Sequence, residues 1–92
     1  SHAYADGCSI YFTFAALQGD PEDARRRHEA AWRAGLDAVV ACGAAVSHHH
    51  GVGLLKGEAL RASHGPLHDV LARVKAALDP GGVMNPGKLG LP

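Results

Sequence analysis

Residues 47–53 of this 92-residue chain constrain its fold most strongly, because they divide it at a turn. They read Ser-His-His-His-Gly-Val-Gly, in which three adjacent imidazoles precede two glycines that tolerate backbone angles closed to other residues. Three small apolar residues, 44–46, lead into this segment. We expect a turn that crowds titratable ring nitrogens where the backbone can come close to a ligand.

The stretch before this turn predicts a long helix. Residues 20–23, Asp-Pro-Glu-Asp, combine an N-cap aspartate, a proline at the first helical position and acids in the first turn. The helix should reach about Cys42, with Gly43 as its left-handed terminator. An apolar stripe for packing on a sheet follows at helical spacing, and it consists of His28, Trp32, Leu36, Val39 and Val40. His28 in such a stripe is more typical of a half-buried histidine than of a ligand.

Two strands are expected, one on each side of that helix. In residues 9–14 apolar side chains alternate with period two, and the pattern extends to Ala16. If the even-numbered residues face the helices, Tyr11 stands on the opposite face, where it is accessible to a ligand. Residues 44–48 form the second predicted strand, which runs into the histidine turn.

The second half of the chain predicts further helix. One or two helical turns are expected within residues 54–62, and residues 65–66 open a last helix that ends at Asp79. Strand, helix, strand, helix is the order of an α+β fold with helices on one face of the sheet. Because two strands rarely form a stable sheet, more strands should come from the rest of a parent chain or from a second copy in a homodimer.

Composition excludes several classes of protein. Nine Lys and Arg against nine Asp and Glu give no net charge with His neutral, so we expect no nucleic acid and no anionic membrane as partner. The two cysteines, Cys8 and Cys42, form no CxxC pair and predict free thiols in a reducing, cytoplasmic compartment. No apolar run approaches the ~20 residues of a membrane helix.

Three segments together resemble a known family. They are the strand-like residues 9–14, the histidine turn, and residues 79–89, which read Asp-Pro-Gly-Gly-Val-Met-Asn-Pro-Gly-Lys-Leu. The chain resembles the C-terminal cap region of FAD-linked oxidases of the vanillyl-alcohol oxidase superfamily, most closely the alkyldihydroxyacetonephosphate synthase branch. This resemblance implies that residues 1–92 are a C-terminal fragment of a ferredoxin-like cap domain, which is inactive without an FAD-binding domain that this chain lacks.

The same resemblance assigns roles to individual residues, with FAD as the cofactor. It implies that Tyr11 and His49 are the catalytic acid/base groups, and that His48 and His50 bind the phosphate or carbonyl oxygen of a small-molecule substrate. The backbone at Gly51 could approach an anion. The resemblance also implies that Asn85 and Lys88, in the C-terminal segment, contact the flavin or the substrate.

The reaction stays open between branches of the superfamily. The synthase branch, a transferase of ether lipid synthesis, exchanges the fatty acid of an acyl-glycerone phosphate for a long-chain alcohol without net oxidation. A bacterial relative could instead oxidise an alcohol or a 2-hydroxyacid such as lactate or glycolate. The C-terminal segment looks more like this dehydrogenase branch, and a cap without activity, kept for dimerisation, is a further reading.

A metal site is not expected. The lactate and glycolate branch carries a His-x-Gly-Asp-Gly-Asn-x-His metal motif, whereas residues 2–9 here lack its second histidine and its asparagine. His64 and His68 are four residues apart, but residues 65–66 place His64 before the last helix, so capping or surface roles are expected for both. The alternative without enzymatic activity is a metal-binding or interaction module built on the three clustered histidines.

Overall fold

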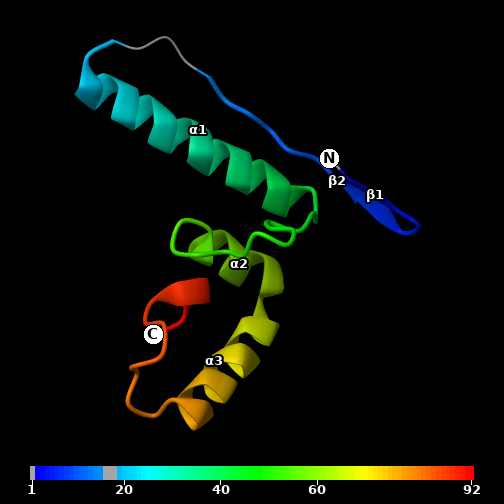
Figure 1. Cartoon of the computed structure of the whole chain (residues 1–92), viewed down its shortest axis with the longest axis vertical. Helices are drawn as coiled ribbons and strands as arrows, with labels where there is room; N and C mark the ends of the chain where they lie inside the picture. The colour runs from blue at the N-terminus through cyan, green and yellow to red at the C-terminus, as the bar shows by residue number, and fades with distance from the viewer. Residues whose placement is uncertain (1, 16–18) are drawn as a thin grey trace. The chain divides into compact units, whose positions relative to one another are not determined.

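The computed structural model describes residues 2–15 and 19–92. Its elements follow in the order β1 (His2–Tyr4), β2 (Gly7–Ser9), α1 (Pro21–Ala41), α2 (Gly57–His64), α3 (Pro66–Leu78) and the 3-10 turn η1 (Lys88–Gly90) (Figure 1). A small sheet followed by helices confirms the α+β class. The chain divides into two compact units, one ending at Gly35 and the other beginning at Leu36, so the boundary falls within α1.

A hairpin that the sequence analysis missed opens the first unit. β1 and β2 pair antiparallel in the register His2 with Ser9, Ala3 with Cys8 and Tyr4 with Gly7. Residues 5 and 6 form its two-residue loop, and the following glycine is typical of such tight connections. The backbone N–H of His2 also donates to Ser9 Oγ at 3.2 Å.

The predicted strand at residues 9–14 is wrong for most of its length, because β2 ends at Ser9 and residues 10–15 belong to no strand. A strand requires a neighbour to accept and donate its backbone hydrogen bonds, and within the described part of the chain no strand pairs with residues 10–15. Ala16, the end of the predicted alternation, lies outside the described residues. One expected contact is present, since the Phe14 ring lies 3.5 Å from where a Cβ on Gly35 of α1 would stand.

Helix α1 begins and ends as its sequence predicts. Asp20 Oδ2 accepts hydrogen bonds from the backbone N–H groups of Glu22 and Asp23, at 3.1 and 3.2 Å, which is N-cap geometry. At the other end Gly43 has φ of +68°, and paired backbone bonds close the helix: Gly43 N to Val40 O and Ala44 N to Val39 O. His28 is exposed and stacks on Trp32, so its predicted half-burial is wrong.

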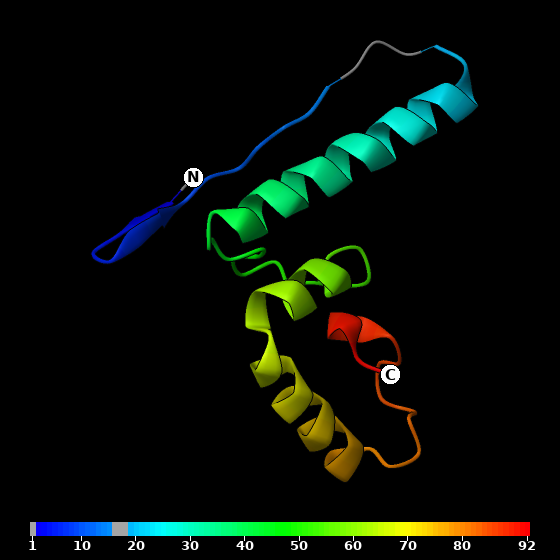
Figure 2. The same cartoon turned by 180° about the vertical axis from the view of Figure 1, so that it is seen from behind.

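The second unit is held together by a C-terminal segment that returns to α2. Both views show η1 beside α2 (Figures 1 and 2). A Cβ on Gly57 would lie 2.8 Å from the backbone nitrogen of Gly90, so the two backbones touch. His68, only 4% exposed, donates from Nε2 to the carbonyl oxygen of Leu89 at 2.9 Å. The predicted surface role of His68 is therefore wrong.

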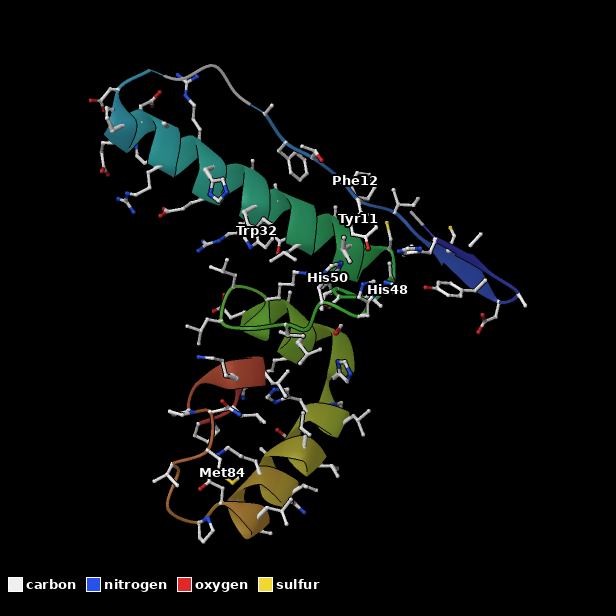
Figure 3. All side chains as sticks on the ribbon, viewed as in Figure 1. Tyr11, Phe12, Trp32, His48, His50 and Met84 are labelled. Carbon is white, nitrogen blue, oxygen red and sulfur yellow. The ribbon has the colours of Figure 1, made fainter. Side chains whose placement is uncertain are left out.

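The turn after α3 is organised by one carboxylate. Asp79 is buried, forms an ion pair with Lys75, and accepts hydrogen bonds from the backbone N–H groups of Val83 and Met84 at 3.0 and 2.9 Å. Lys75 also donates to the carbonyl oxygen of Met84, which lies near the end of α3 in Figure 3. The hydrogen bond from Lys75, followed by that from the Met84 amide, lowers the pKa of Asp79 against an opposing effect of desolvation.

The described residues bury little apolar surface. Val46 and Leu91, at 9% and 7% exposure, are the buried hydrophobic residues among them. Residues 44–48 form no strand, so the second predicted strand is also wrong. On α3 an apolar stripe is exposed, consisting of Leu67, Val70, Val74 and Leu78. Within the described ranges, no helix is both long and apolar enough to cross a bilayer.

Candidate functional site

The rings of the three histidines lie close together on one turn of the second unit. The rings of His48 and His49 have centroids 4.3 Å apart at 69°, and those of His49 and His50 are 4.2 Å apart at 30°. All three side chains are exposed, and Figure 3 shows His48 and His50 projecting from the same loop. The predicted crowding of imidazoles is therefore confirmed, with His49 between the other two rings.

A hydrogen bond joins two of these rings through their Nδ1 atoms. His48 Nδ1 and His49 Nδ1 are 2.5 Å apart, so one of them donates and the other accepts. Which ring carries the shared hydrogen depends on the tautomer, and the two tautomers are mutually dependent. The chemical state of His48 and that of His49 are thus linked.

The backbone around the cluster is fixed by a side-chain bond and two glycines. Ser47 Oγ donates to the carbonyl oxygen of Gly51 at 2.6 Å and closes the turn over the histidines. Gly51 and Gly53 have φ of +80° and +59°, and no atom lies within 4 Å of the position of a Cβ on either. Their backbone is therefore accessible, as the pattern of histidines followed by glycines predicts.

The C-terminal segment lies against this turn. The backbone N–H of Leu89 donates to the carbonyl oxygen of Gly53 at 3.4 Å, and Leu54 Cδ2 lies 3.6 Å from the Cβ position of Gly87. Asn85 adopts the left-handed region with φ of +47°, and its carbonyl oxygen accepts from the N–H of Lys88 at 3.3 Å. The structure thus brings the segment with both residues next to the glycines of the histidine turn.

Tyr11 lies in the other unit. It is exposed, and its hydroxyl lies 3.4 Å from His2 Nε2, with the two rings meeting edge to face at a centroid distance of 6.0 Å. Figure 3 labels it on the extended segment that follows the hairpin. Sequence analysis did not identify His2 as its neighbour. The cross-strand pairing of His2 with Ser9 would have been the signal, but the hairpin was not recognised.

The remaining histidine has a local structural explanation. His64 Nδ1 donates to the carbonyl oxygen of Leu60 at 3.0 Å and lies 3.1 Å from Ser63 Oγ, at the end of α2. A side chain that hydrogen-bonds a carbonyl in the last turn caps the helix. The prediction of a capping role for His64 is confirmed.

Taken together, the second unit presents ring nitrogens and open glycine backbone on one surface. Imidazole N–H groups can donate to a phosphate or carbonyl oxygen, and a neutral ring nitrogen can accept a proton. Clustered imidazoles can also bind a transition metal. The arrangement is suited to orienting a polar substrate and moving a proton.

Comparison with known proteins identifies the family. The family model described as "FAD linked oxidases, C-terminal domain" matches residues 1–89. Alkyldihydroxyacetonephosphate synthase of Trypanosoma brucei brucei is 33% identical over 90 residues, which is 97% of this chain and 14% of the relative. The same enzyme of Dictyostelium discoideum is 34% identical over 91 residues, 97% of this chain and 15% of the relative.

A bacterial protein matches over a similar length. An uncharacterized FAD-linked oxidoreductase of Escherichia coli K12 is 27% identical over 92 residues, 97% of this chain and 19% of the relative. The chain thus spans less than a fifth of the length of these curated relatives. No solved structure matches it at a significant level. The match over nearly its whole length shows that the chain belongs to the C-terminal domain family of the FAD-linked oxidases.

Proposed function

We propose that this chain is the C-terminal substrate segment of an FAD-dependent enzyme resembling alkyldihydroxyacetonephosphate synthase, and that it supplies acid/base and substrate-orienting groups at the flavin. The observation that carries the proposal is the closed histidine turn, with its three adjacent imidazole rings in contact and its Ser47 to Gly51 hydrogen bond. Because the chain covers less than a fifth of its relatives, an FAD-binding domain elsewhere in the parent protein is part of the proposal.

The residues present fit a contribution to such a site. Open backbone at Gly51 and Gly53 allows a planar or anionic group to approach, since no side chain occupies the Cβ positions. Exposed imidazoles beside it provide the donors that a phosphate or a carbonyl oxygen requires. FAD, when bound, would supply the electron-accepting chemistry that no amino-acid side chain offers.

The hydrogen bond between the two Nδ1 atoms supports different roles for His48 and His49. In a neutral ring, a hydrogen on Nδ1 leaves a lone pair on Nε2, whereas a lone pair on Nδ1 places the hydrogen on Nε2. If His49 donates the shared hydrogen, its Nε2 is a base, and His48 Nε2–H becomes a donor to the substrate. This tautomer pair gives each residue the role that the family resemblance implies: His49 accepts a proton and His48 binds an oxygen.

The other predicted residues take supporting roles in the proposal. The ring of His50 packs on that of His49 and restricts its orientation, while its own nitrogens meet the substrate's phosphate or carbonyl oxygen. The N–H of Gly51 would face an anion. Asn85 and Lys88 lie on the segment that is hydrogen-bonded to Gly53, and we assign them to flavin or substrate contacts.

Tyr11 is proposed as the second acid/base group. A phenol can hold or release a proton next to a substrate carbon when a neighbouring group accepts its hydrogen bond. His2 Nε2 lies at 3.4 Å from the Tyr11 hydroxyl and is suited to that position. The acid/base role of Tyr11 is the one that the family resemblance implies for it.

Two reactions are open to such a set of residues. The relatives named alkyldihydroxyacetonephosphate synthase favour exchange of an acyl group for a long-chain alcohol on a glycerone phosphate. The Escherichia coli relative named as an oxidoreductase favours a second candidate, net oxidation of an alcohol or 2-hydroxyacid. In both, His49 would take a proton from the substrate while His48 and His50 hold its oxygens.

An absorbance experiment on the complete protein tests the proposal. We expect a flavin spectrum that bleaches under anaerobic conditions when a 2-hydroxyacid or acyl-dihydroxyacetone phosphate is added. Loss of a general base costs about 10²- to 10⁴-fold in rate, so His49→Gln should slow bleaching by that amount. Tyr11→Phe should slow bleaching by a similar factor, because it removes the hydroxyl that would transfer the proton and leaves the rest of the ring in place.

A matched control separates chemistry from loss of an imidazole. His64→Gln replaces an exposed histidine whose Nδ1 hydrogen-bonds within α2, and it should leave the bleaching rate unchanged. A colourless protein that carries stoichiometric zinc or nickel on the histidine turn would overturn the proposal and favour the metal-binding alternative.

A further inference from the structure

The hairpin brings a histidine to the hydroxyl of Tyr11, and this contact points to a further residue of the proposed site. His2 Nε2 and the Tyr11 hydroxyl are 3.4 Å apart, and the rings lie edge to face at 74° with centroids 6.0 Å apart. The distance is long for a hydrogen bond, but such bonds often shorten when substrate enters. Both residues belong to the first unit, so their contact is internal to it.

Local backbone pairing accounts for the contact. His2 is the cross-strand partner of Ser9, and its backbone N–H also donates to Ser9 Oγ. Tyr11 follows Ser9 by two residues, just beyond the end of β2, so the chain that leaves the hairpin carries its aromatic side chain within reach of His2. The hairpin therefore brings the imidazole and the phenol together within the first unit.

We propose that His2 is the positioning residue for Tyr11: its Nε2 accepts the hydrogen bond of the phenol and holds the hydroxyl in one orientation for proton transfer. The inference rests on the proposed function of Tyr11 as an acid/base group. Tyr11 is about half exposed and lies on an extended segment outside any strand. An accepting ring at its oxygen would restrict both the side-chain torsion and the direction of the O–H bond.

The arrangement follows the logic of other acid/base pairs, in which one group reacts and a second orients it. A neutral imidazole with its hydrogen on Nδ1 presents a lone pair at Nε2, which the hydroxyl of Tyr11 can donate to. His2 does not have to touch the substrate for this effect. Its loss should therefore lower the rate of the step that Tyr11 performs and leave substrate binding unchanged.

Kinetics of the complete flavoprotein test the inference. We expect His2→Ala to slow anaerobic flavin reduction about 10- to 100-fold, the range seen when a partner that orients a functional side chain is removed. KM should stay within about twofold of wild type, because the interaction concerns proton transfer and not binding. His2→Gln should recover much of the rate, since its side-chain carbonyl can accept the same hydrogen bond.

His28→Ala is the matched control. This histidine is also exposed and also lies against an aromatic ring, but that ring is the hydroxyl-free indole of Trp32, 6.4 Å away between centroids. Its replacement should leave the rate unchanged. The double variant with Tyr11→Phe supplies a second criterion, because a residue acting through Tyr11 has no further effect once the hydroxyl is gone.

A spectroscopic readout makes the test independent of turnover. With histidine rings labelled with ¹⁵N, the Nε2 signal of His2 should shift on Tyr11→Phe, as expected when a hydrogen-bond donor is removed. Each of three results would overturn the inference. They are an unshifted Nε2 signal, a wild-type rate of flavin reduction for His2→Ala, and a double variant in which the two substitutions lower that rate independently. If Tyr11→Phe itself reduces flavin at the wild-type rate, the proposed function of Tyr11 fails, and an intact spectral shift would show that the contact nevertheless exists.

Discussion

Replacing Gly57 with alanine should detach the C-terminal segment from α2. The added Cβ would stand 2.8 Å from the backbone nitrogen of Gly90 and 3.0 Å from its Cα. Ordinary contacts of this kind are roughly 3.5 Å or more, so the two segments must separate by roughly 0.5 to 0.7 Å. Both neighbours are backbone, and neither can move aside as a flexible side chain would.

The cost follows from this displacement. Forcing an extra methyl group into a close contact typically costs about 1 to 3 kcal/mol. The nearby hydrogen bond from Leu89 N to Gly53 O, already 3.4 Å long, would be lengthened beyond a useful distance, and its loss adds about 1 kcal/mol. We expect a local destabilisation of about 2 to 4 kcal/mol. Alanine is otherwise favoured over glycine within a helix, so without the contact to Gly90 the substitution Gly57→Ala should stabilise the protein. A loss of stability would therefore be evidence for that contact.

Hydrogen exchange measures this local opening directly. At about 1.4 kcal/mol for each factor of ten, the opening equilibrium of η1 should rise by about 30- to 700-fold in Gly57→Ala. The amide of Leu91, which donates to the carbonyl oxygen of Lys88, is a suitable reporter. Amides within α1 should exchange at unchanged rates.

Two other glycines provide matched controls. Gly81→Ala meets only Val83 Cγ1 at 3.9 Å, which is an ordinary contact, and it should leave exchange nearly unchanged. Gly90→Ala adds a Cβ 2.8 Å from Gly57 O at a φ of +69°, whereas Gly82→Ala has a similar φ of +64° and no atom within 4 Å. The difference between these two variants isolates the clash from the left-handed backbone. Equal exchange rates in Gly57→Ala and Gly81→Ala would refute the reasoning.

Three further predictions concern other parts of the chain. Ser47→Ala removes the bond to Gly51 O that closes the histidine turn, at a cost of about 1 kcal/mol, and should slow flavin reduction; an unchanged rate would show that the bond is dispensable. Asp20→Ala removes the N-cap of α1 and should lower the stability of this helix by about 1 kcal/mol, measured by thermal unfolding. An unchanged unfolding temperature would show that water replaces the carboxylate fully. The pKa of Asp79 is lowered from 3.8, so its contribution to stability is complete above that value and is lost as pH falls through the lower folded pKa. Acid unfolding should therefore show the stability gap between wild type and Asp79→Asn closing below pH 3.8, and a gap independent of pH would contradict this assignment.

Local chemistry was sufficient to predict some elements. The N-cap aspartate, the proline after it and the left-handed Gly43 define α1 by interactions within a few residues, and the prediction was close to Pro21–Ala41. The histidine turn is likewise local, because its glycines and the bond from Ser47 lie within seven residues. Its Nδ1 pairing depends on ring orientation, which a sequence does not specify.

Elements that depend on distant partners could not be predicted in this way. Residues 10–15 alternate as a strand does, but they form none, because no strand among the described residues pairs with them. His68 is buried because the carbonyl oxygen of Leu89, 21 residues later, returns to it. Neither outcome leaves a mark in the nearby sequence. The residues of the candidate site therefore stay a prediction from the sequence and its family resemblance, whereas the contacts around them, including that of His2 with Tyr11, were not predicted.

The close backbone contact between Gly57 and Gly90 also affects how loss-of-function variants should be interpreted. The C-terminal segment donates a hydrogen bond to Gly53, so a variant at Gly90 would disturb the backbone next to the histidine turn, which lies about 40 positions earlier and which we propose to be part of the site. In a screen for inactive proteins, such a variant would be recovered alongside replacements of the histidines themselves. Restoring activity through a compensating change near Gly57, and not at a histidine, would distinguish a structural lesion from a chemical one.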